Sequence, residues 1–177
     1  MSLVCWSAAL PPVMGVDGRL HRPLTEARGR PVVFLFISHD CPVCNTYAPE
    51  IARIEARYKG RVAIAIVYSE ARLSRDGARK HAREYSISNA TLLLDSNSEF
   101  AAACDAHFTP QAVVFDSKGR IAYSGRIDDR YLALGRQLPT ATTHDLTLAL
   151  DAVLAHRPAT PASGPPVGCL IILPHKT

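Results

Sequence analysis

Two cysteines, Cys41 and Cys44, stand two residues apart in the segment SHDCPVCNTYAPE, residues 38–50. Such a pair can bind a metal, close a static disulfide or work as a redox dithiol. A zinc site needs two further ligands, and the sequence offers no second pair and only His39 close by. A static bridge across so short a loop adds little stability. The spacing therefore favours a working dithiol, with no bound metal and no cofactor.

The segments on either side of the pair explain how its sulfurs differ. Residues 30–38 form an apolar, β-branched and aromatic run that predicts a buried strand, and a helical pattern follows over 42–58. Cys41 then lies at the N-terminus of a helix, where free N–H groups and the helix dipole favour a thiolate. Cys44 lies one turn further on and is expected to be more buried. Cys41 is predicted to attack a disulfide and Cys44 to resolve the product, with Pro42 stiffening the loop.

The remaining patterns predict an α/β fold with helices on both faces of a sheet. A hairpin is expected over residues 15–24 and another over 110–125. Further strands are predicted at 61–69 and 91–94, and further helices at 74–86, 96–106 and 142–157. Ser96 or Ser98 is expected to cap the second of these helices, Thr142 and Asp145 to form a capping box on the third, and Pro49 to kink the helix at 42–58.

The bulk properties fit one globular domain. The chain has 177 residues and a net charge of +4 without a basic run, so neither nucleic acid nor an anionic membrane is an expected partner. No apolar segment is long enough to span a membrane. The N-terminus lacks the features of a signal peptide, and its abrupt MSL start is interpreted as a cloning leader that replaced any export signal. A periplasmic location is favoured on that interpretation over a cytoplasmic one.

Residues 13 to 155 resemble the thioredoxin superfamily, and specifically its redoxin branch. Three features carry the resemblance: the Cys pair after a buried strand, Pro49 five residues after Cys44, and FTPQAVVFD downstream. The resemblance implies a thioredoxin fold with a central mixed sheet, an N-terminal hairpin and one strand-helix insertion. It implies that Pro110 is cis and that Thr109 and Pro110 bind a substrate chain beside the dithiol. The implied partners are protein disulfides or dithiols, and a flavoprotein or thioredoxin-like electron donor.

The chain departs from ordinary thioredoxins at two places. Asp40 stands where they have Trp, and Leu35 stands where they have a buried Asp. Asp40 is expected to raise the pKa of Cys41, and a protonated His39 would offset that effect. The reduction potential is open across roughly −270 to −120 mV, and so is the direction of electron flow.

The sequence is also compatible with two other functions. A peroxiredoxin has Ser or Thr three residues before its attacking cysteine, and Ser38 fits. However, Phe34 replaces an expected proline, and Pro110 stands where the peroxide-polarising arginine should be, so the developing charge lacks a stabiliser. The third possibility is a binding module that docks partners through the same surface without turnover. Oligomeric state is not predicted.

Three further cysteines and a charged loop complete the candidates. Cys5 is expected to have no role, and Cys104 to be a small buried apolar residue.

Residues 1–12 are predicted to be a leader, 13–157 the domain, and 158–177 a Pro-rich tail that docks on it. GRIDDRY (125–131) and the late Gly-Cys of the tail resemble uncharacterised redoxin-like proteins. Cys169 is either part of apolar tail docking or a third redox cysteine. Arg126 and its loop are expected to be solvated or internally paired, or else to form a rim for partners.

Overall fold

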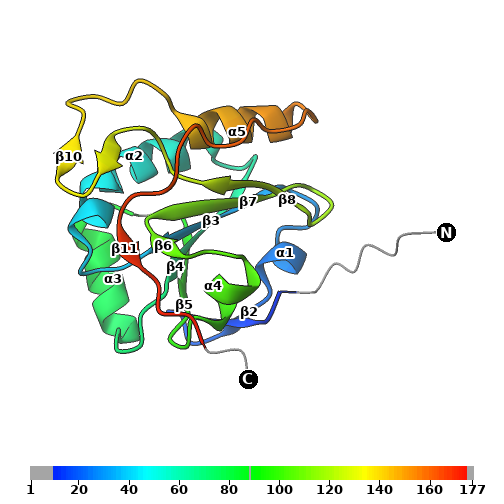
Figure 1. The fold of residues 1–177 in the computed structure, drawn as a ribbon. Helices are drawn as coiled ribbons and strands as arrows, with labels where there is room; N and C mark the ends of the chain where they lie inside the picture. The colour runs from blue at the N-terminus through cyan, green and yellow to red at the C-terminus, as the bar shows by residue number, and fades with distance from the viewer. Residues whose placement is uncertain (1–9, 88, 175–177) are drawn as a thin grey trace.

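The structure is a computed structural model that describes residues 10–87 and 89–174. Within these ranges one seven-stranded sheet has the strand order β2-β1-β5-β4-β3-β7-β8 (Figure 1). Its strands are β1 (Val13–Gly15), β2 (Leu20–His21), β3 (Val32–Ile37), β4 (Ala63–Tyr68), β5 (Thr91–Leu94), β7 (Gln111–Phe115) and β8 (Ile121–Gly125). The helices are α1 (Pro23–Glu26), α2 (Pro42–Tyr58), α3 (Arg75–Glu84), α4 (Glu99–Ala103) and α5 (Asp145–Leu154).

Two pairs of short strands accompany this sheet. β9 (Tyr131–Ala133) pairs with β10 (Arg136–Gln137), and β6 (Phe108–Thr109) pairs with β11 (Cys169–Leu170). The second pair joins the C-terminal tail to the middle of the domain, as the red segment beside β6 in Figure 1 shows.

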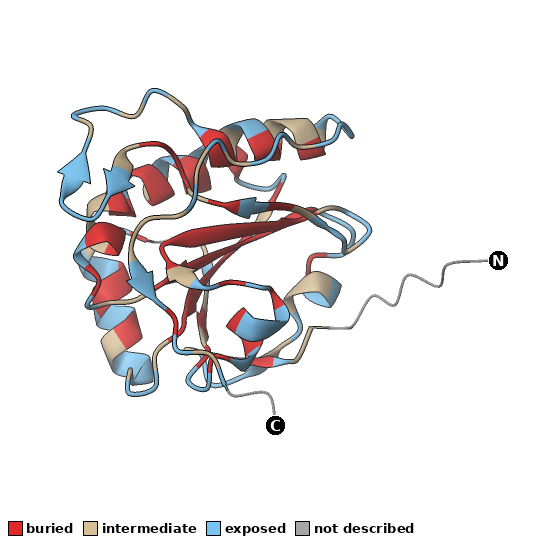
Figure 2. Ribbon diagram, in the orientation of Figure 1, coloured by how far each residue is buried: buried red, intermediate tan, exposed pale blue. Residues whose placement is uncertain are grey.

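β3 is the centre of the sheet. It runs parallel to β4 and antiparallel to β7, and all six of its residues are buried. Because side chains alternate along a strand, β3 supplies two cores. Val33, Leu35 and Ile37 pack with α2, α3 and α5 on one face of the sheet. Phe34 and Phe36 pack with Phe100 of α4 on the other face. Figure 2 shows the central strands almost entirely buried.

Most predicted elements are confirmed, with boundaries that differ by a few residues. α2 begins and ends where the helical spacing places it, and its apolar side chains are buried at that spacing. The hairpin β1–β2 lies at one edge of the sheet, and the hairpin β7–β8 lies at the other. β5 and α4 stand between α3 and β7 as the expected strand-helix insertion. α1, β9, β10 and β11 were not predicted, because each has four residues or fewer and too little pattern to detect.

Both predicted helix caps are wrong. Ser98 occupies the N-cap of α4 in the left-handed region (φ 56°), and its side chain makes no capping bond. The Asp95 carboxylate accepts instead from the backbone N–H groups at the start of that helix. Thr142 bonds to Asp129, and the N-cap of α5 is His144. At α4 an aspartate three residues before Ser98 takes the capping role, and at α5 Thr142 lies before the N-cap and bonds Asp129 instead of the helix.

The chain after α5 returns across the domain. Ala159 and Ala162 pack against the core that contains α2 and α5, and Ile171 is buried in the other core. The domain boundaries at residues 12 and 157 remain predictions, and Cys5 lies outside the described residues. No helix in the described part of the chain has the length and hydrophobicity needed to cross a membrane.

Candidate active site

The turn after β3 places the two cysteines. β3 ends at Ile37, and Cys41 is the N-cap of α2 with extended backbone angles (φ −79°, ψ 112°). Pro42 occupies the first helical turn, where its missing N–H leaves no bond unmade. Cys41 therefore lies at the positive end of the helix dipole, as predicted.

Three sulfurs meet at this point. The Cys169 thiol donates to Cys41 Sγ at 3.1 Å, and Cys41 Sγ lies 3.4 Å from the carbonyl oxygen of Thr109, to which Cys41 donates when it is protonated. Cys41, Cys44, Cys104 and Cys169 are all free thiols. The structure is thus the reduced form of the site, and it brings the tail cysteine to the predicted nucleophile.

The thiols differ strongly in acidity. Hydrogen bonding from the Cys44 thiol, with a further hydrogen bond from Cys169, lowers the pKa of Cys41 to about 4. Burial, followed by its hydrogen bond to Cys41, raises the pKa of Cys44 well above its ordinary value. The hydrogen bond to Cys41 also raises the pKa of Cys169 to about 11. The predicted acidity of Cys41 is confirmed, although neighbouring thiols contribute to it as well as the helix terminus.

Both cysteines are almost completely covered from solvent, and burial dominates the environment of Cys44, as predicted. Cys41 is 1% exposed and Cys44 is 3% exposed. Cys41 is covered because the tail places Cys169 directly against it, while Cys169 itself is exposed. The sequence predicted that the tail docks on the domain and left open whether Cys169 joins the site; the structure places it against Cys41.

The loop before β7, which contains Thr109 and Pro110, lies beside Cys41. The Thr109–Pro110 peptide bond is cis, as the resemblance predicts. Thr109 is buried, and in β6 it pairs with Cys169 of β11. Its hydroxyl also donates to the Cys169 carbonyl at 3.5 Å. The loop expected to bind a substrate chain is therefore paired with the protein's own tail.

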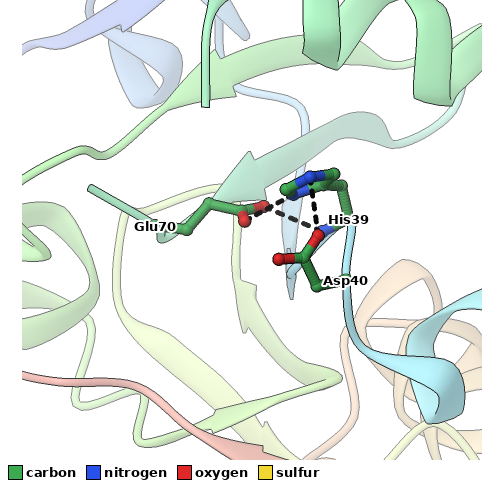
Figure 3. A group of neighbouring side chains, drawn as sticks. All are labelled: His39, Asp40 and Glu70. Carbon is green, nitrogen blue, oxygen red and sulfur yellow. Dashed lines mark hydrogen bonds and ion pairs between the residues drawn. The ribbon is translucent and has the colours of Figure 1, made fainter. Parts of the chain in front are cut away.

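A small polar cluster lies at the rim. His39 Nε2 is 2.6 Å from Asp40 Oδ1, and His39 Nδ1 is 2.6 Å from Glu70 Oε2. Figure 3 shows the His39 ring between the two carboxylates. Ser38 also donates to Glu70. Three potential ligand atoms thus lie within 4.8 Å of one another. Both ring nitrogens already face carboxylates, so the cluster is explained as a set of contacts that hold the loop before α2 in place. Asp40 is paired with His39. Asp40 was expected to raise the pKa of Cys41, but the hydrogen bonds from the neighbouring thiols lower that pKa.

Behind the dithiol the structure holds a neutral network that the sequence did not reveal. Leu35, in place of the usual acid, is fully buried. The Tyr68 hydroxyl and His81 Nδ1 are hydrogen-bonded at 2.9 Å, and His81 Nε2 bonds Asn45 at 2.9 Å. Burial lowers the pKa of His81, which keeps its ring neutral at pH 7. The side chains that converge here come from α2, β4 and α3, so no local pattern in the sequence could join them.

The two remaining predicted supporting residues, Arg126 and Pro49, lie outside the group of contacts around the sulfurs. Arg126 pairs with Asp145 (Nε to Oδ2, 2.8 Å) and donates to Ser163, so its loop is internally paired. Pro49 lies exposed inside α2. Cys104 is fully buried in the core beside α4, as expected of a small apolar residue.

Comparisons with known proteins bear on this site. The Redoxin family model matches residues 15–131. An uncharacterized conserved protein from Geobacillus kaustophilus is 27% identical over 94% of this chain and 90% of its own, with a TM-score of 0.81. A hypothetical protein from Sinorhizobium meliloti is 23% identical, with 93% and 91% covered and a TM-score of 0.80.

A secreted disulfide oxidoreductase from Mycobacterium tuberculosis shares the fold at 19% identity, with 84% of this chain and 96% of that chain covered and a TM-score of 0.59. No curated protein matches the sequence. These similarities confirm the predicted thioredoxin fold.

Proposed function

The chain belongs to the redoxin branch of the thioredoxin superfamily, and on this premise we propose that Cys41 and Cys44 exchange disulfides with partner proteins. The observation that supports the proposal most directly is geometric: Cys41 is the N-cap of α2, Cys44 follows in its first turn, and Cys41 Sγ lies beside the cis Thr109–Pro110 bond. The pKa of Cys41 is about 4, whereas that of Cys44 is raised far above its usual range. One sulfur is therefore a thiolate at neutral pH while its neighbour keeps its proton.

This pair supports a two-step exchange. A disulfide bond forms between Cys41 and one partner sulfur as the partner's own disulfide breaks and its second sulfur leaves as a thiolate. Cys44, once deprotonated, attacks Cys41 Sγ and releases the reduced partner. The cysteine pair is then oxidised by two electrons and the partner is reduced by two. The reverse sequence oxidises a partner dithiol.

The acidity of Cys41 favours the oxidising direction. A thiolate that is stabilised in the reduced protein is a good leaving group, and it raises the potential of the disulfide. We expect a potential nearer to about −120 mV than to about −270 mV. Partner protein dithiols would be the substrates, and a second redox protein would restore the disulfide. A location outside the cytoplasm is part of this proposal, since one protein of the same fold is secreted.

Peroxide reduction has less support. Ser38, the residue that suggested it, donates to Glu70. Cys41 has hydrogen bonds to Thr109 and Cys169, and within the described residues no arginine or lysine side chain hydrogen-bonds to it. A peroxide oxygen at Cys41 would lack a cation to stabilise its developing charge.

Insulin-reduction and peroxide-consumption assays test the proposal. We expect wild-type protein to catalyse insulin reduction, Cys41→Ser to be inactive and Cys44→Ser to be slower by about tenfold or more. Cys104→Ala, which changes a cysteine on the other face of the sheet, is the control and should retain activity. Peptide mapping of the oxidised wild type should give a Cys41–Cys44 disulfide.

Turnover of peroxide alone would replace this proposal with a peroxidase. The absence of turnover in both assays would favour a binding module. Equilibration with a glutathione series measures the potential, and a value near that of thioredoxin would contradict the expected direction.

A further inference from the structure

The C-terminal tail occupies the edge of the active site as a short strand. β11 pairs antiparallel with β6, in a register that sets Cys169 opposite Thr109 and Leu170 opposite Phe108. The N–H of Ile171 continues the pairing by donating to the carbonyl oxygen of His107 at 2.9 Å. An added strand of this kind is how many proteins bind an extended peptide. The tail therefore lies where a peptide partner of the proposed dithiol would pair.

The tail is fixed to the domain on both sides of Cys169. Upstream, the backbone N–H and hydroxyl of Ser163 both donate to Asp145, at 2.9 and 2.8 Å. Downstream, Ile171 is buried in the core that contains α4, and Leu173 packs against the same core. Cys169 is thus held over Cys41 by anchors that do not involve either sulfur.

Gly168 shows how closely the two segments approach. A Cβ atom at this position would lie 2.0 Å from the carbonyl oxygen of Thr109 and 2.8 Å from its carbonyl carbon. Both are backbone atoms that cannot rotate away. Only glycine allows the tail to pack this tightly against Thr109, so the Gly-Cys dipeptide positions the thiol.

The two sulfurs differ in access. Their separation of 3.1 Å is about 1 Å longer than a disulfide bond, so a small movement would join them. Cys41 is 1% exposed, whereas Cys169 is exposed and lines an open groove of about 530 Å³. The other walls of this groove include Glu70 and Ser98, and Cys41 does not line it. A partner protein that approaches the site meets Cys169 first.

We propose that Cys169 is a third redox cysteine, which exchanges a disulfide with Cys41 and passes it to partner proteins at the surface. The inference rests on the proposed exchange at Cys41 and Cys44, and adds the route by which a partner reaches a covered sulfur. The tail then acts as a built-in substrate strand that remains tethered between turnovers.

The steps balance without an added reagent. In the oxidised protein the Cys169 thiolate attacks Cys41 Sγ, a Cys41–Cys169 bond forms, and Cys44 leaves and takes up a proton. A partner thiolate attacks the exposed Cys169 Sγ and releases the Cys41 thiolate. The partner's second thiolate then attacks its own bonded sulfur and releases Cys169. The partner dithiol becomes a disulfide, and the Cys41–Cys44 disulfide becomes a dithiol.

Disulfide mapping in Cys44→Ser tests whether the two sulfurs bond. Glutathione disulfide supplies the oxidation and leaves as two glutathione thiols. We expect an intramolecular Cys41–Cys169 bridge in this variant. Adding Gly168→Ala should push the tail away and give glutathione adducts in place of the bridge. A Cys41–glutathione adduct with Cys169 free, in Cys44→Ser with Gly168 intact, would overturn the inference.

Single-turnover oxidation of a reduced dithiol peptide by the oxidised protein tests the relay. We expect Cys169→Ser to be slower by about tenfold or more, because the tethered thiol supplies a high effective concentration. Leu148→Ser, at an exposed position of α5 outside the groove that Cys169 lines, should match the wild type. A rate for Cys169→Ser equal to or above that of the wild type would overturn the relay while leaving exchange at Cys41 and Cys44 intact. A wild-type protein that neither oxidises the peptide nor turns over insulin would instead overturn the proposed function.

Discussion

Replacing Cys169 by alanine should make Cys41 less acidic. The Cys169 thiol donates to Cys41 Sγ at 3.1 Å, and this bond is among the causes that lower the pKa of Cys41. A hydrogen bond to a charged group contributes about 1.5–3 kcal/mol, and a sulfur donor belongs at the weak end of that range. Since one pKa unit corresponds to about 1.4 kcal/mol, the loss amounts to about one unit. The pKa should rise from about 4 to about 5.

Serine provides the matched control for this change. A Cys169→Ser side chain is nearly isosteric and keeps a donor for the Cys41 thiolate, so the pKa of Cys41 should stay within a few tenths of the wild type. The difference between the alanine and serine variants therefore isolates the hydrogen bond from any general effect of removing a cysteine.

The assay follows the ultraviolet absorbance of the thiolate against pH in the fully reduced protein, with Cys41→Ser as the blank. Equal pKa values in wild type, Cys169→Ala and Cys169→Ser would refute the reasoning, because the tail thiol would then not touch Cys41 in solution. A second readout is the intrinsic nucleophilicity of the thiolate. A rise of one unit should make it about threefold more reactive toward a small disulfide at pH 7.

Three further substitutions test contacts around the site. Arg126→Ala breaks a largely buried ion pair with Asp145, and should lower the free energy of urea unfolding by about 3 kcal/mol; a loss below about 1 kcal/mol would mean the pair is not formed. Tyr47→Phe leaves Asp128 without its 2.6 Å donor in a buried position and should cost about 1–3 kcal/mol in the same measurement; unchanged stability would contradict the contact. Asp95→Ala removes the carboxylate that caps α4 and should cost about 1–2 kcal/mol. A cap supplied by Ser98 instead would leave that variant as stable as the wild type.

The parts of the fold that the sequence predicted are those with a strong local pattern. The run 30–38 is apolar at every position of the observed strand, which is the pattern of a strand covered on both faces, and it became β3. The segment 42–58 repeats its apolar residues at helical spacing and became α2. The caps failed for the opposite reason. Asp95 stands beside the two serines in the same segment, and the residue types alone do not decide which of the three side chains reaches the helix N–H groups; Thr142 is drawn to Asp129, thirteen residues away, which no local pattern contains.

The candidate site divides in the same way. The start of α2 and the position of Cys41 on it follow from neighbours in sequence, and so did the expected acidity. Glu70 and His81 reach the site from elsewhere in the fold, and neither stands in a motif. Their roles depend on the parallel pairing of β3 and β4, which sets the ends of those strands side by side.

No periodic pattern in the sequence could predict which segment the C-terminal tail pairs with. β6 and β11 have two residues each, and sixty residues separate Cys169 from the Thr109 it pairs with. Pairs this short are not stable alone, so this one exists because Ser163 and Ile171 fix the tail on either side. The Gly-Cys dipeptide is visible in the sequence, but its role is not. The structure shows that position 168 must be glycine because a Cβ atom there would collide with the Thr109 backbone. A cysteine that served apolar docking alone would not need its sulfur aimed at the one acidic thiol in the site. Its position there is the reason to treat the tail as part of the chemistry.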